Sequence, residues 1–176
     1  MMFDPTVFDN LKVAFENQLY DLDTLDRKID IINRIDRMEM AVMSREFALQ
    51  FRLAGRSAVS AEVQLSSSLK DLAAEILEWK GETPSCSLRL RFVMKLHQID
   101  EQCEQIEQIM MRIWEPDAPP TQTISYVYGA PNSMYTNVIE LAFSRKINEE
   151  QMDDIEGLVN HMLQTLTKLE ELSKSE

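Results

Sequence analysis

Large apolar side chains recur every third or fourth residue along most of the chain, in long segments without glycine or proline. The clearest segment lies between Pro84 and Glu115, where these positions are Phe92, Leu96, Ile99, Cys103, Ile106, Met110 and Ile113. This spacing places them on one side of an α-helix, opposite acidic and amide side chains. The pattern therefore predicts a long helix that ends before Pro116. Its start stays open, because residues 86–92 also alternate as a strand would.

Two further segments pose a choice between one long helix and shorter elements. Over 58–80 the apolar positions suit a helix that Gly81 would end; the alternative is a strand over 59–65 followed by a shorter helix from residue 68. Over 21–54 the alternative is a β-hairpin. Its turn at Ser44-Arg45 lacks the glycine, asparagine, aspartate or proline that such turns favour. The helical interpretation is favoured in both segments.

The two ends of the chain are predicted with different clarity. Asn148 is a good N-cap and Gln151 follows three residues later, as in a capping box. The apolar spacing from Met152 to Leu169 then predicts a helix that fades near Ser173. The segment 7–16 fits either a helix or a strand, and both stay open.

Residues 122–144 follow another pattern, with aromatic and β-branched side chains alternating on both sides of a loop at Gly129. Such residues favour strands, so the pattern predicts a β-hairpin, to which residues 11–15 could add a third strand. The expected fold is a single domain over 1–176 of the mainly α (α+β) class. It is an antiparallel bundle of about four long helices with a small antiparallel β-hairpin or three-stranded sheet.

Charge and composition narrow the partners and the compartment. The net charge of −12 opposes nucleic-acid binding, which needs clustered lysine and arginine. No apolar run approaches the length of a membrane span, and the first residues carry acids where a secretion signal carries bases. The two cysteines form no metal-binding or redox motif. We expect a cytoplasmic protein that binds neither nucleic acid nor membrane.

The sequence offers little chemistry. Only four glycines occur, no two of them close enough for a phosphate-binding loop. Neither histidine has the glutamate three residues earlier that a di-iron bundle needs. No catalytic residue, cofactor or metal is expected. The one alternative comes from Glu75, Glu78, Glu101 and Glu104, whose spacing resembles the magnesium-binding motifs of helical nucleotide pyrophosphohydrolases. That resemblance implies a magnesium-dependent enzyme.

The favoured function is protein–protein interaction without catalysis, as an adaptor or a chaperone-like protein that forms homo-oligomers. Tyr126, Tyr128 and Tyr135 lie around the predicted hairpin loop and are candidate interaction residues, because tyrosine is enriched among the anchors of interfaces. The eleven methionines are expected mainly to fill gaps in the core, and the alternative is an adaptable binding surface. The identity of the protein partner does not follow from the sequence.

Overall fold

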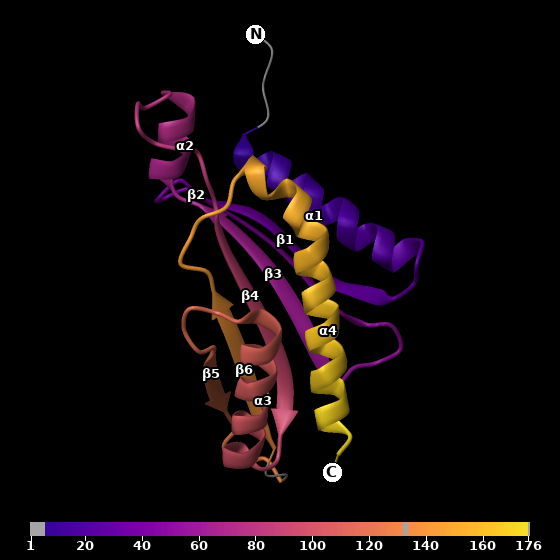
Figure 1. Cartoon of the computed structure of the whole chain (residues 1–176). Coiled ribbons are helices and arrows are strands. Elements are labelled where there is room, and N and C mark those ends of the chain that lie inside the picture. Colours follow the sequence, from indigo (N-terminus) through magenta and orange to yellow (C-terminus); the bar gives the residue numbers. More distant parts are fainter. Residues whose placement is uncertain (1–5, 132–133, 176) are drawn as a thin grey trace.

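The computed structural model describes residues 6–131 and 134–175. These residues form one antiparallel sheet of six strands in the order β1-β2-β3-β4-β6-β5, together with four α-helices (Figure 1). The strands are β1 (Ile29–Glu39), β2 (Ser44–Leu53), β3 (Val59–Ser67), β4 (Ser87–Leu96), β5 (Thr121–Ser125) and β6 (Tyr135–Ala142). The helices are α1 (Val7–Thr24), α2 (Leu69–Ile76), α3 (Ile99–Trp114) and α4 (Ile155–Ser173), with the 3₁₀ helix η1 (Glu149–Asp154) before α4.

Three of the helices, α1, α3 and α4, lie on one face of the sheet (Figure 1). In Figure 1, α1 crosses the sheet near β1, α4 runs along the middle of the sheet, and α3 lies beside α4. The core forms between this layer and the sheet, and most of its strand residues come from β2, β3, β4 and β6. The largest fully buried side chains include Phe15, Phe47, Phe51, Phe92, Leu49, Leu65, Leu90 and Leu96. The short helix α2 stands apart, at the end of the sheet where β2 begins and β3 ends.

The predicted bundle of four long helices is wrong. The segment 84–115 contains a strand, β4, and only then the helix α3. Leu88, Leu90 and Phe92 are buried at alternate positions between β3 and β6. Phe92 and Leu96 are four residues apart, so they fit the two-residue period of a strand as well as the spacing of a helix. The apolar pattern of α3 therefore continues back into β4. Residues 87–96 form a strand because they pair with β3 on one side and β6 on the other.

The long helices predicted over 58–80 and 21–54 are also wrong, and in both segments the structure has the alternative elements. The segment 58–80 divides into β3 and α2 at Ser68, whose side chain caps α2. The segment 21–54 holds the hairpin of β1 and β2, and its turn spans residues 40–43. Met43 has a positive φ of 55° there, so a residue other than glycine or asparagine takes the left-handed turn position.

The first and the last element of the described chain are both helices, α1 and α4. Residues 7–16 belong to α1, and the strand alternative for them is wrong. The capping box predicted from Asn148 and Gln151 is present, although it begins η1 and not α4 itself. β5 pairs antiparallel with β6, and the further neighbour of β6 is β4 rather than residues 11–15.

The strand β1 forms one edge of the sheet and is irregular. Its pairing with β2 shifts between Ile31 and Asn33, which leaves a bulge at Ile32. Five of its eleven residues are charged, and the backbone N–H of Ile31 donates a hydrogen bond to a carboxylate oxygen of Asp23 in α1 (3.2 Å). The edge is therefore bent, charged and partly capped.

Candidate functional site

The helix α2 docks on the rest of the protein through polar contacts. The Oε1 atom of Glu75 accepts a hydrogen bond from the backbone N–H of Val7 at the start of α1 (2.8 Å). Asp71 forms an ion pair with Lys146 and a reciprocal capping box with Ser68. Ala74 is the one residue of α2 that is buried. The polar side of this helix therefore faces the protein.

The apolar side of α2 faces solvent. Leu69, Ile76, Leu77 and Trp79 are between 43% and 66% exposed. The β1–β2 turn lies at the same end of the sheet, because Arg45 pairs with Ser67 directly before α2. This turn adds three exposed side chains. Together these residues form what we call the α2 surface: Met40, Val42, Met43, Leu69, Ile76, Leu77 and Trp79.

The Asp71 contacts give a testable pH dependence. Burial raises the pKa of Asp71, but hydrogen bonds from Lys146 and Ser68 outweigh burial and hold that pKa below its usual value. A carboxyl group whose pKa is lower in the folded state stabilises the fold above its unfolded pKa, near 4, and this contribution disappears as pH falls through the folded pKa. Asp71→Asn is expected to reduce the free energy of unfolding by about 1 kcal/mol at pH 7 and to have no effect once wild-type Asp71 is protonated.

Urea unfolding at pH 7 and in steps below pH 4 measures this difference. Glu78→Gln is the control, because Glu78 is an exposed acid just after α2 and should change stability little at any pH. An equal loss for Asp71→Asn at every pH would show that its charge does not hold α2 in place.

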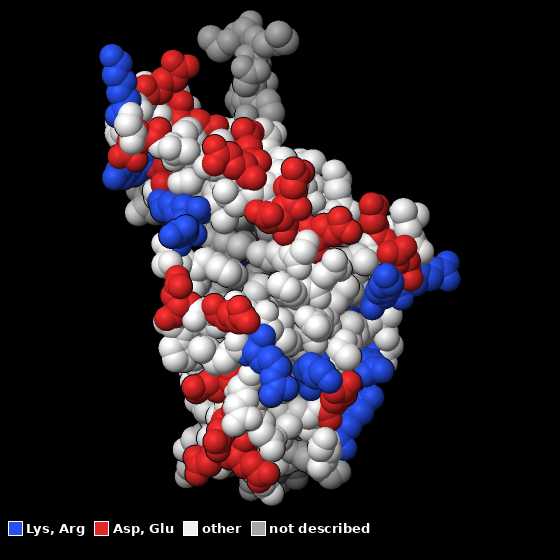
Figure 2. Space-filling model, in the orientation of Figure 1, with Lys and Arg blue, Asp and Glu red and all other residues white. Residues whose placement is uncertain are grey.

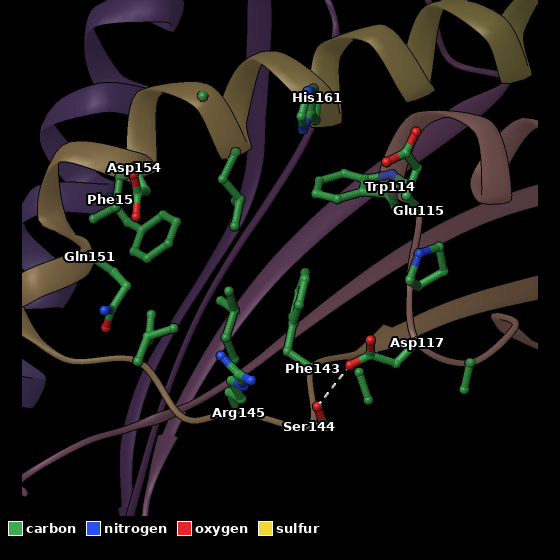
Figure 3. Close-up of a pocket in the computed structure, with 18 of the residues that line it drawn as sticks. Phe15, Trp114, Glu115, Asp117, Phe143, Ser144, Arg145, Gln151, Asp154 and His161 are labelled. Atoms are coloured by element: carbon green, nitrogen blue, oxygen red, sulfur yellow. Dashed lines mark hydrogen bonds between the residues drawn. The ribbon is translucent and has the colours of Figure 1, made fainter.

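A groove of about 650 Å³ opens between the end of α3, the segment after β6 and the first half of α4 (Figure 3). Its floor includes the buried side chains of Phe15, Leu88 and Ile155. Trp114 and Phe143 project into it, with their ring centroids 6.3 Å apart and one edge toward the other face.

Trp114 is held in place from α4. Its Nε1 atom donates a hydrogen bond to Oγ1 of the buried Thr165 (3.0 Å), and its ring packs at 5.4 Å from the ring of His161. Across the groove, Ser144 donates a hydrogen bond to a carboxylate oxygen of Asp117 (3.2 Å). These contacts fix the aromatic wall and join the two loops at the groove entrance.

The groove carries acidic side chains. Glu115, Asp117, Asp153 and Asp154 line it, against a single arginine, Arg145. Within residues 6–131 and 134–175, none of these four acids forms an ion pair. Figure 2 shows the same face of the molecule, where acidic side chains gather over α1 and the start of α4. The groove is thus apolar inside and negative at its margin.

The four glutamates of the enzyme alternative do not form one site. Glu75 is bonded to the start of α1, and Glu78 lies in the turn after α2. Glu101 and Glu104 lie on α3, which the strand β4 separates from α2 and which occupies the opposite end of the sheet (Figure 1). In the described part of the chain, no three histidine, cysteine, aspartate or glutamate side chains gather in a way that could hold a metal ion.

The predicted tyrosines occupy unlike positions. Tyr135 is half-buried in β6 and packs edge-on against Tyr126 at 6.0 Å between ring centroids. Tyr128 is 93% exposed in the loop between β5 and β6. Tyr126 and Tyr128 are therefore accessible to a partner, and their role as interaction residues stays a prediction.

Sequence reasoning missed the groove and the orientation of α2. The prediction used residues 116–120 only to end a helix, and it assigned no role to Trp114. A signal existed in Glu115 and Asp117, because acids next to the C-terminal end of a helix oppose its dipole. Burial raises the pKa of Cys86 to about 12, so this thiol stays protonated at neutral pH.

The chain matches no family model, no curated protein and no solved structure. Among the helices described, none is both long and apolar enough to cross a bilayer. The function is therefore inferred from the surfaces of the protein itself.

Proposed function

We propose that the protein acts by binding other proteins, as an adaptor or a chaperone without catalysis of its own, and that it works as a homo-oligomer in the cytoplasm. The observation that supports this most is the orientation of α2. Its polar side forms contacts within the chain, and its apolar side is exposed to solvent. Apolar surfaces of this kind mark sites of protein association.

The extent of the α2 surface favours a second copy of the chain as its occupant. Seven side chains, each about half exposed, offer roughly 400 Å² of apolar area. A stable interface covers about 800 Å² on each partner, a little over half of it non-polar. Two α2 surfaces related by a two-fold axis would therefore form an interface of ordinary size.

The charge of the chain agrees with this arrangement. Two copies that each carry −12 repel one another, so an interface between them has to be stabilised by apolar contact rather than by charge. A cytoplasmic location agrees with the two free cysteines, Cys86 and Cys103, because thiols stay reduced in that compartment.

Sedimentation velocity of the purified protein tests self-association. The wild type is expected to sediment with twice the mass of one chain at micromolar concentration. The double variant Ile76→Asp and Leu77→Asp is expected to sediment as a single folded chain, because it places two desolvated charges in the centre of the interface.

Leu25→Asp is the matched control. Leu25 is 73% exposed after α1, away from the α2 surface, so this variant should remain a dimer. A wild type that stays monomeric at all concentrations would refute self-association. A dimer that persists in the double variant would place the interface elsewhere.

A further inference from the structure

We propose that the groove between α3, α4 and the segment after β6 binds a segment of a partner protein that combines large apolar side chains with lysine or arginine. The groove shares no residue with the α2 surface, so it can be filled whether or not the chain forms dimers. The inference depends on the proposed function only in taking the ligand to be a protein.

The interior of the groove suits apolar side chains. Phe143 remains 37% exposed although it lies against Trp114, so an apolar ring is left accessible inside the groove. The Trp114 ring is fixed by Thr165 and His161, so the aromatic wall needs little reordering when a ligand enters. A rigid wall of this kind lowers the entropic cost of binding.

The acids at the margin point to a basic ligand. Asp153 and Asp154 directly precede α4. Carboxylates at this position stabilise a helix by interacting with the positive end of its dipole, so these two acids are explained without a ligand. Glu115 and Asp117 follow the end of α3, where the dipole disfavours carboxylates. Their position is unfavourable for the helix and favourable for a ligand with positive charge.

The backbone at Glu115 strengthens this argument. Glu115 caps α3 in the left-handed conformation, with φ of 43°, a position that glycine fills with least strain. A glutamate there costs stability through its backbone as well as its charge. Strained residues of this type concentrate at functional sites.

Charge also distinguishes the occupant from a second copy of the chain. The protein carries −12 overall, and the groove margin carries four acids against one arginine. A second copy would add negative charge to a negative margin. Lysine or arginine beside the apolar side chains of a partner would instead approach the carboxylates and the aromatic faces of the groove.

Trp114 can report binding directly. The chain has two tryptophans, and Trp79→Phe leaves Trp114 as the only one, which can be excited at wavelengths that tyrosine does not absorb. We would titrate this variant with the synthetic peptide KKLFLLKK and with two matched peptides: EELFLLEE, which reverses the charge, and KKSSSSKK, which removes the apolar residues. The first is expected to shift Trp114 emission to shorter wavelength, and to bind at least tenfold more tightly than either of the others.

Substitutions in the same background locate the site. Asp153→Asn with Asp154→Asn is expected to weaken the binding of KKLFLLKK about fivefold, and Phe143→Ser about tenfold. Glu115→Gly is expected to weaken binding as well, while raising the thermal midpoint, because glycine relieves the left-handed backbone. A purely structural role of Glu115 would change the midpoint and leave the affinity unchanged. Glu104→Gln with Glu107→Gln, on exposed positions of α3, should bind within twofold of the parent.

Several outcomes would overturn the proposal. Equal affinity for the lysine and glutamate peptides would remove the charge argument, and unchanged binding in Phe143→Ser would place the peptide elsewhere. A change of oligomeric state in Phe143→Ser would make the groove an interface between copies of the chain. Repeating the titration with Ile76→Asp and Leu77→Asp separates this test from self-association, since the groove should bind equally well in the monomer.

Discussion

Phe92→Ala is expected to lower the free energy of unfolding by about 3–5 kcal/mol, a large part of the stability of a domain of this size. Phe92 is fully buried in the central strand β4. Its cross-strand neighbours are Ala61 in β3 and Ile139 in β6. Ala61 is too small to fill the space left by the ring, and strands on both sides limit any collapse of the sheet, so the cavity persists.

Urea unfolding followed by circular dichroism measures this loss. The midpoint should fall while the dependence of the free energy on urea stays constant, because the folded and unfolded states expose the same surface otherwise. Val93→Ala is the control: Val93 is the next residue, on the opposite and partly exposed face of the sheet, and should cost less than about 1 kcal/mol. Similar losses for both variants would contradict the assignment of the core face.

Glu170→Leu is expected to cost about 1–3 kcal/mol, although leucine is apolar and the site is buried. Glu170 lies near the end of α4 with 2% of its surface exposed. Its Oε1 atom accepts a hydrogen bond from the backbone N–H of Val59 at the start of β3 (3.0 Å). Leucine would leave that N–H buried without an acceptor.

Hydrogen exchange at the Val59 amide distinguishes this cause from a general loss of packing. Exchange at Val59 should accelerate in Glu170→Leu more than at other β3 amides, and Glu170→Gln, which keeps an acceptor oxygen, should restore most of the protection. Glu171→Leu alters the neighbouring exposed glutamate and should change stability by a few tenths of a kcal/mol. Unchanged exchange at Val59 would show that Glu170 does not anchor β3.

The sequence predicted the elements that carry their own local signals. Asn148 and Gln151 form a capping box by their own side chains, and the alternation before and after Gly129 belongs to two strands that do pair. The other strands were not predicted, because the contacts that stabilise them come from residues remote in the sequence. Leu88 and Leu90 depend on partners in β3 and β6, and those partners were themselves assigned to helices or to a separate hairpin.

The two proposed binding surfaces show the same limit. Leu69 and Ile76 have the spacing of core residues. They nevertheless face solvent, because Glu75 bonds to the start of α1 and Asp71 pairs with Lys146, which places the polar side of α2 against the protein. The groove brings together Trp114 of α3, Phe143 of the segment after β6 and Leu158 of α4, so no local sequence pattern contains it. A surface that exists only through the arrangement of distant elements cannot be found by local spacing.

The bent edge at β1 opposes one route by which copies of this chain could assemble, the addition of strands to the sheet at that edge. In the proposed two-fold dimer the two copies would cover each other's α2 surface, so a larger assembly would need a second contact. A long straight outer strand would supply one, by templating strand after strand into a fibre. The bulge at Ile32, the charges along β1 and the Asp23 carboxylate on Ile31 remove that template. The β1 edge therefore offers a second copy of the chain no template on which to add strands.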